Sequence, residues 1–131
     1  TKKIYRVNPA LENLPDWTKG IGSFNEDHHK LSKIPKSAII SEVVKCISFD
    51  KLIKDFHVKH IDLLQIDTEG YDYEIIKMID FKNIRPTIIG FEHGLKEGIM
   101  SDKQYAACHN KLFQEGYSII TLKRDSIAYL S

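Results

Sequence analysis

The spacing of apolar residues changes several times along the chain, and each change predicts a new element of secondary structure. Residues 4–7 and 39–47 are rich in β-branched side chains, which predicts two strands. Residues 61–67 form a nearly continuous apolar run, typical of a strand that is buried on both faces of a sheet. Residues 87–91 form a similar run and predict a fourth strand.

Helical spacing appears between and after these strands. Apolar residues fall three or four positions apart over 49–56 and again over 73–79, so each segment predicts a helix with one buried face. A third helix is predicted over 101–113, where Ser101 and Gln104 have the spacing of a capping box.

Two short strands, 117–122 and 127–130, are predicted at the end of the chain. The polar segment between them contains Lys123 and Arg124 and predicts a solvated turn. Strands that alternate with helices predict an α/β fold with a largely parallel sheet, and the closing pair predicts an antiparallel edge. We expect residues 1–131 to form a single domain.

Residues 8–38 interrupt this alternation with little periodicity and three of the four prolines. A segment of this length without elements of its own is uncommon in a compact domain, so it predicts a lid or binding loop. His28 and His29 lie in it, and like His57 and His60 they have no evident ligand partners. All four histidines are therefore predicted to lie at the surface.

Composition narrows the classes of partner. A net charge of +1 over 131 residues provides no positive field for nucleic acid. No apolar run approaches the ~18–20 residues that span a bilayer. Cys46 and Cys108 lie far apart without a Cys-x-x-Cys pair, which favours two buried, reduced thiols in a cytoplasmic protein.

Acidic residues stand where two predicted strands end. Asp67 ends the first, with Glu69 two positions further on, and Glu92 ends the second, with His93 beside it. Ligands bind beyond the carboxyl ends of parallel strands, so these four side chains converge on one rim if the strands are neighbours. Structural alternatives remain open, because Asp67 can cap the following turn and Glu69 can interact with a helix N-terminus.

The run at 61–74 resembles the signature of FkbM-type S-adenosylmethionine-dependent methyltransferases, in which a hydrophobic strand leads into Asp-x-Glu-Gly and an acidic helix start. Residues 48–52 are similar to the family's Thr-Leu-Asp-x-Leu segment. Residues 85–92 are similar to its Arg-Pro, strand and Glu. Residues 17–29 look like the Gly-x-x-Ser segment of some members. Gln65 departs from the pattern, which usually has Lys there.

By that resemblance the fold is the Rossmann-like sheet of class I methyltransferases, of which the chain matches the C-terminal part. No segment resembles the first two strands or the glycine-rich cofactor loop, and the Gly-x-Gly at 20–22 follows no predicted strand. Without those strands the strand at 61–67 becomes an exposed apolar edge, which predicts self-association. The strand at 4–7 corresponds to the family's third, which implies that Asn8 and Ala10 bind the adenine end of the cofactor.

The resemblance implies methyl transfer from S-adenosylmethionine to a hydroxyl oxygen of a small molecule or glycan. Asp67 and His93 are the expected proton acceptors, and Glu69 and Glu92 are expected to orient the acceptor. The expected substrate-binding residues lie in the irregular segment and are Trp17, Phe24, His28 and His29.

Three alternatives stay open at this point. Asp67, Glu69 and Glu92 can instead hold a divalent cation that polarises the hydroxyl, although we do not favour a metal. The chain can be a non-catalytic binding or assembly module derived from the same fold. A metal-dependent hydrolase that uses Asp67, Glu69 and His93 ranks third.

Overall fold

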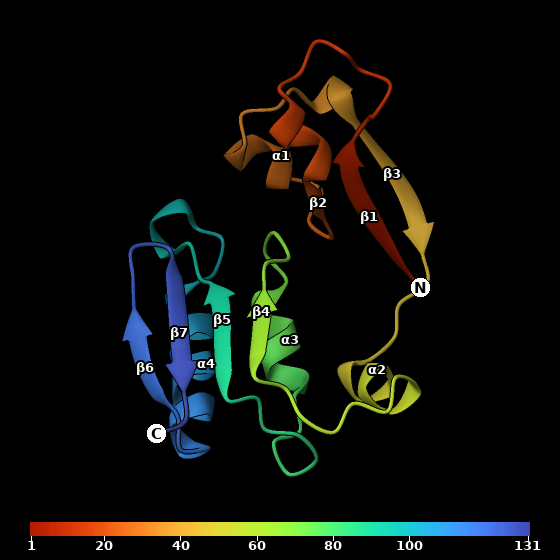
Figure 1. The fold of residues 1–131 in the computed structure, drawn as a ribbon. Coiled ribbons are helices and arrows are strands. Elements are labelled where there is room, and N and C mark those ends of the chain that lie inside the picture. Colours follow the sequence, from red (N-terminus) through yellow and green to blue (C-terminus); the bar gives the residue numbers. More distant parts are fainter. The chain divides into compact units, whose positions relative to one another are not determined.

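A computed structural model describes all 131 residues, Thr1–Ser131, and the chain forms two compact units (Figure 1). The first unit comprises Thr1–Cys46 and Thr68–Tyr71, and the second comprises Ile47–Asp67 and Asp72–Ser131. Both units combine strands with helices, so the predicted α/β class is confirmed.

The first unit is built on an antiparallel sheet with the strand order β2-β1-β3. β1 (Lys2–Val7) pairs with β3 (Ile39–Val44) along its whole length, and β2 (Gly22–Ser23) pairs with its other edge. The strands predicted at 4–7 and 39–47 are therefore confirmed as elements. The expectation of a mostly parallel sheet is wrong for this unit.

The antiparallel pairing follows from the short elements between β1 and β3. A parallel pair needs a crossover connection, usually a helix of several turns. Residues 8–38 contain only η1 (Asp16–Gly20), α1 (His28–Leu31) and η2 (Lys36–Ala38) besides β2. The chain therefore returns on itself, and the N–H of Asn8 donates to the carbonyl of Ala38 at 2.8 Å.

The second unit contains a mixed sheet with the strand order β4-β5-β7-β6. β4 (Leu63–Ile66) and β5 (Ile88–Glu92) are parallel, as predicted for these neighbours. β7 (Asp125–Tyr129) pairs antiparallel with both β5 and β6 (Ser118–Thr121). The predicted antiparallel pair at the end of the chain is confirmed, but one parallel pair does not make the sheet mostly parallel.

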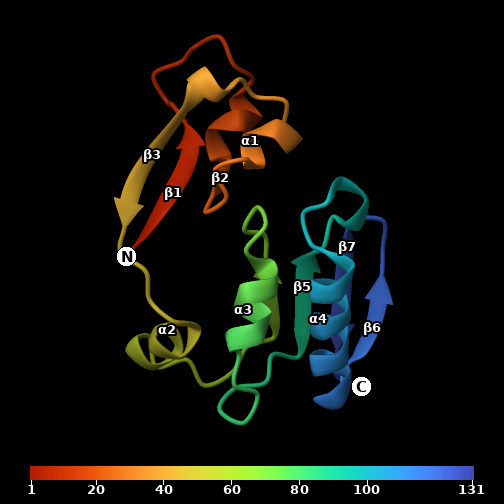
Figure 2. The ribbon, with the colours of Figure 1, turned by 180° about the vertical axis from the view of Figure 1, so that it is seen from behind.

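Helices α3 (Asp72–Met78) and α4 (Asp102–Gln114) cover one face of this sheet, as the two opposite views show (Figures 1 and 2). α4 begins with the predicted capping box between Ser101 and Gln104. α2 (Phe49–Asp55) precedes β4, and η3 (Leu95–Glu97) follows β5. None of the helices has the length and apolar character to cross a bilayer. The largest completely buried side chains of this unit include Ile76, Ile89, Phe91, Leu112 and Tyr117.

β4 lies at the edge of its sheet, where β5 is its only strand neighbour. Leu63 is 58% exposed, so the burial of this strand on both faces, predicted from its apolar run, is wrong. The edge position predicted for this strand is confirmed. Apolar side chains also remain exposed on the face opposite α3 and α4, among them Ile88, Ile120, Ile127 and Tyr129.

Burial corrects the predictions for the cysteines and for two of the histidines. Cys46 is exposed just after β3, whereas Cys108 is buried on α4, so only one of the two thiols is buried as predicted. His28 and His29 are buried, because α1 packs them within the first unit, and their predicted surface location is wrong. His57 and His60 are exposed, as predicted.

Candidate functional site

The parallel pairing of β4 and β5 brings two acidic residues to the same edge of the second unit's sheet. The register pairs Ile66 with Phe91, and the next residue on each strand is an acid, Asp67 on one and Glu92 on the other. Asp67 is exposed to solvent. The predicted convergence of the acidic residues required these two strands to be neighbours. The structure meets this condition for Asp67 and Glu92.

Glu92 is held at both its backbone and its side chain. Its N–H donates to Oδ2 of Asp72 at 2.8 Å, and Asp72 is almost completely buried at the start of α3. Its carboxylate accepts a hydrogen bond from Nη2 of Arg124 at 2.6 Å, and the Glu92 side chain is only 12% exposed. Arg124 therefore balances a largely buried charge. It lies in an exposed turn, as predicted, and its ion pair with Glu92 was not predicted.

His93 is buried directly behind this edge. Its Nδ1 accepts the N–H of Leu95 at 3.3 Å, so the neutral ring carries its proton on Nε2. That Nε2 is buried without a hydrogen-bond partner, and the ring packs 4.9 Å from the ring of Tyr105. The N–H of His93 donates to the carbonyl of Arg124 at 2.8 Å. These contacts hold the imidazole away from solvent.

The Asp-x-Glu-Gly turn continues into the first unit, to which Thr68–Tyr71 belong. Glu69 has a φ of 50° and Gly70 a φ of 100°, so the turn needs two successive residues with positive φ. Glycine adopts this conformation readily, so Gly70 suits the second of these positions. Glu69 adopts it in spite of its Cβ.

Residues 22–28 contact this turn within the first unit. The hydroxyl of Ser23 donates to the carbonyl of Glu69 at 2.6 Å, and Nε2 of His28 lies 2.7 Å from Oε2 of Glu69. The ring of Phe24 meets the ring of Tyr71 edge-on at 4.9 Å. The structure therefore places the Glu69 side chain beside His28 and Phe24 beside the same turn.

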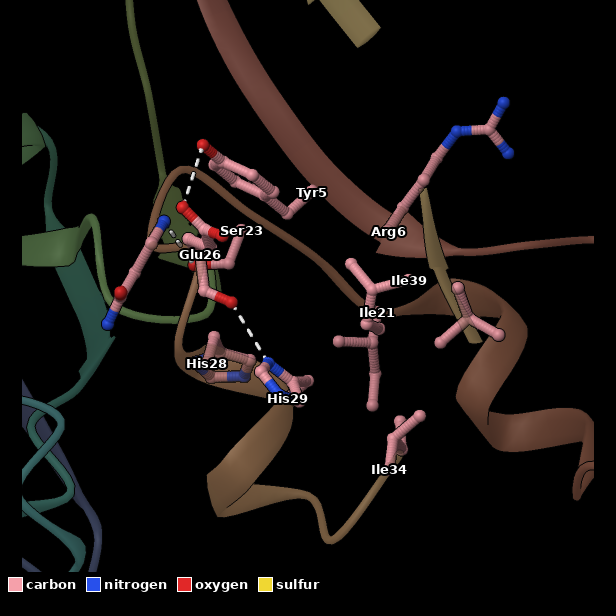
Figure 3. Close-up of a pocket in the computed structure, with 11 residues that line it drawn as sticks. Tyr5, Arg6, Ile21, Ser23, Glu26, His28, His29, Ile34 and Ile39 are labelled. Carbon is pink, nitrogen blue, oxygen red and sulfur yellow. Dashed lines mark hydrogen bonds between the residues drawn. The ribbon is translucent and has the colours of Figure 1, made fainter. Parts of the chain in front are cut away.

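One small cavity of the first unit is shown in Figure 3, where His28 and His29 lie at the start of α1. Nδ1 of His29 donates to the carbonyl of Glu26 at 2.9 Å. The cavity volume is about 10 Å³, which is roughly the space of one water molecule. An organic acceptor does not fit this cavity in the conformation described.

The other residues predicted to bind ligands lie in the first unit as well. Trp17 is 62% exposed on η1. Asn8 and Ala10 follow β1, where Oδ1 of Asn8 accepts the N–H of Ala10 at 3.0 Å in a tight turn. Their predicted roles in binding the acceptor and the adenine stay predictions.

The glycine pair that precedes Ser23 gives no cofactor cradle. Gly20 ends η1 and Gly22 begins β2, so neither opens a helix toward a ligand. A Cβ added to Gly20 would meet no atom within 4 Å, so nothing approaches its backbone closely. The structure also brings no three His, Cys, Asp or Glu side chains together as metal ligands.

Comparison with known proteins assigns the chain to a family. The family model described as the methyltransferase FkbM domain matches residues 5–119, which is most of the chain. The chain belongs to the FkbM methyltransferase family. None of the curated proteins and none of the solved structures compared with it matches. The family resemblance stated from the Asp-x-Glu-Gly segment is confirmed.

Two contacts within this FkbM domain, one in each unit, were not expected from the sequence. Arg124 pairs with Glu92 across β7 and β5, and Ser23 holds the backbone of Glu69 from 46 positions away. No local pattern marks either residue, because each contact depends on how distant segments pair. The resemblance of residues 17–29 to the Gly-x-x-Ser segment was the one signal that pointed near Ser23.

Proposed function

We propose that this FkbM protein transfers a methyl group from S-adenosylmethionine to a hydroxyl oxygen of a small molecule or glycan. The family match supports methyl transfer. The juxtaposition of Asp67 and Glu92 at one edge of the sheet is the observation that supports the site. Asp67 supplies an exposed carboxylate at this edge, which is a suitable acceptor for a hydroxyl proton.

S-adenosylmethionine supplies an electrophilic methyl group on its sulfonium, which leaves as a neutral thioether when the methyl carbon bonds to the acceptor oxygen. Asp67 accepts the proton of the acceptor hydroxyl, because it is the exposed carboxylate at the end of β4. Glu92, fixed by Arg124 and Asp72, orients the acceptor from the neighbouring strand. Asn8 and Ala10 are the proposed contacts for the adenine end.

His93 has a smaller part in this proposal than the sequence suggested. Its Nδ1 is already engaged with Leu95 and its Nε2 is buried, so the exposed carboxylate is better placed to receive a proton. His93 instead lies behind Glu92 and stiffens the edge through its backbone bond to Arg124.

The test is a methyl-transfer assay with S-adenosylmethionine and a panel of hydroxyl acceptors, with S-adenosylhomocysteine as the detected product. Asp67→Asn is expected to lower turnover by roughly 10²–10⁴-fold while calorimetric binding of S-adenosylmethionine persists. The control is Asp62→Asn, which changes an exposed carboxylate near the opposite end of β4. If Asp67→Asn and the wild type have equal turnover, Asp67 is not the base.

A non-catalytic assembly module is the second candidate. The uncovered apolar face of the second unit's sheet favours it, because such faces mark interaction surfaces. The two candidates are separated by calorimetry with S-adenosylmethionine. An assembly module binds no cofactor under any condition in which it is folded, whereas a methyltransferase does.

A further inference from the structure

Glu69 occupies a backbone conformation that residues with a Cβ rarely adopt. Three non-glycine residues have positive φ, namely Lys33, His57 and Glu69. Lys33 and His57 each lie two residues after a short helix, where left-handed residues commonly end helices. Glu69 follows no helix, so something else in the structure must hold it.

Two buried side chains contact Glu69 from the segment at 22–28. The hydroxyl of Ser23 donates to its carbonyl at 2.6 Å, and Oγ of Ser23 accepts the N–H of Asn25 at 3.1 Å, which orients the hydroxyl. Nε2 of His28 lies 2.7 Å from the Glu69 carboxylate, within ion-pair distance although not aligned as a hydrogen bond. Ser23 is 3% exposed and His28 is 4% exposed.

The two contacts act on different parts of Glu69. Ser23 holds the peptide carbonyl and therefore the left-handed turn. His28 holds the carboxylate and therefore the side-chain direction. The edge-on pair of Phe24 and Tyr71 and the ammonium of Lys2, 4.5 Å from the Tyr71 ring centre, pack the rest of the turn. A residue held at both ends loses little conformational freedom when it meets a ligand.

We propose that Ser23 and His28 are positioning residues that fix the backbone and the carboxylate of Glu69 for contact with the methyl acceptor. The inference rests on the proposed function and deepens it, because it assigns the orientation of Glu69 to the segment at 22–28. His28 then contributes through Glu69 and not as a wall of the acceptor site. A buried imidazole against a carboxylate suits that role better than direct contact with substrate.

Thr18 provides a control for His28. It lies on η1 in the same unit and is also buried, at 1% exposure. Its hydroxyl donates to the carbonyl of Pro15 at 2.7 Å, so this bond stays within its own segment and does not reach Glu69. Loss of either polar group disturbs packing in the first unit, but only the loss of His28 releases the carboxylate.

The first test is kinetic and uses His28→Gln, Ser23→Ala and the control Thr18→Val in the methyl-transfer assay. The His28 and Ser23 variants are expected to lose at least about tenfold in kcat while KM for S-adenosylmethionine stays within about twofold. The control is expected to keep kcat within about twofold. Ser23→Thr retains a hydroxyl and is expected to recover most of the kcat lost in Ser23→Ala. Equal losses of kcat in His28→Gln, Ser23→Ala and the control would overturn the proposal, because they would indicate a general loss of packing.

The second test does not depend on activity. Urea midpoints are measured for His28→Gln, Glu69→Gln and the double variant. If the two side chains interact, the double variant unfolds at about the midpoint of the weaker single variant, whereas additive shifts would overturn the contact. Absence of methyl transfer by the wild type would overturn the proposed function alone, and the urea cycle would still decide whether His28 holds Glu69.

Discussion

The buried carboxylate of Asp72 accepts the backbone N–H of Glu92 at 2.8 Å, which ties the start of α3 to the end of β5. Asp72→Ala removes this acceptor and is expected to lower the free energy of unfolding by about 1–3 kcal/mol, because the N–H of Glu92 loses its partner. Asp72→Asn keeps an oxygen acceptor and is expected to cost less. Urea denaturation measures both.

Asp102→Ala is the control for Asp72, because Asp102 is also the first residue of a helix but is exposed. We expect its effect to stay below ~1 kcal/mol, the range of an exposed charge near a helix start. A loss as large as that of Asp72→Ala would assign the effect to the helix start and not to the contact with Glu92.

Lys111 on α4 binds backbone carbonyls at the C-terminal end of α3. Its ammonium donates to the carbonyls of Lys77 at 2.6 Å and Ile79 at 2.9 Å, groups that have no partner within the helix. Lys111→Met is expected to cost about 1–2 kcal/mol of unfolding free energy. Lys103→Met, an exposed change on the same helix, is expected to be neutral in the same urea titration. Equal effects would show that the carbonyl contacts contribute nothing.

The two thiols are expected to differ in reactivity. Burial raises the pKa of Cys108 from 9.0 to about 11, with a smaller contribution from the charge of Asp72. Iodoacetamide at pH 8 is therefore expected to add one group to the folded protein, at exposed Cys46, and two in urea. Mass spectrometry after peptide digestion locates the adducts. Early alkylation of Cys108 in the folded protein would contradict its burial.

The same pKa gives stability a pH dependence. Above pH 9 the unfolded thiol of Cys108 ionises while the folded thiol stays protonated, so the folded state binds more protons and stability falls as pH rises toward 11. The loss is expected to reach ~2 kcal/mol near pH 11. Burial also raises the pKa of Tyr117, so the measurement is the difference in slope between wild type and Cys108→Ala. Parallel slopes would rule out the contribution of Cys108.

Gly94 and Gly98 both have positive φ but differ in the space around them. A Cβ at Gly94 would lie 2.6 Å from Cδ1 of Ile99 and 2.8 Å from its Cβ, whereas a Cβ at Gly98 would meet nothing within 4 Å. We expect Gly94→Ala to cost about 3 kcal/mol and Gly98→Ala about 1 kcal/mol. Thermal unfolding with the two variants side by side separates backbone strain from the clash with Ile99, and equal losses would exclude the clash.

The exposed edge of β4 predicts association with a second copy of the chain. Leu63 is 58% exposed on that strand, and the edge presents free backbone groups beyond it. Sedimentation velocity is expected to show concentration-dependent association that Leu63→Lys reduces. Phe113→Lys, at a 68% exposed position on α4, is expected to leave it unchanged. A monomer at all concentrations, with one cooperative melting transition, would refute the prediction.

The sequence by itself determined the elements and the family of this protein. Local spacing of apolar and capping residues predicted four strands and one helix start. These are β1, β3, β4, β5 and the capping box of α4. The Asp-x-Glu-Gly turn with its flanking segments identified the FkbM family, because a signature of this kind is contiguous in sequence. Asp67 and Glu92 could also be located from the sequence, because each stands at the end of an apolar run that predicts a strand.

Only the tertiary structure decided strand direction, exposure and the contacts of the acidic residues. Apolar runs do not reveal whether a strand has one neighbour or two, so the exposure of Leu63 on β4 was not visible in its composition. The contacts of Glu69 with Ser23 and His28, and of Glu92 with Arg124, join residues between 32 and 46 positions apart. Such pairs depend on how sheets and turns close, and no local propensity encodes them.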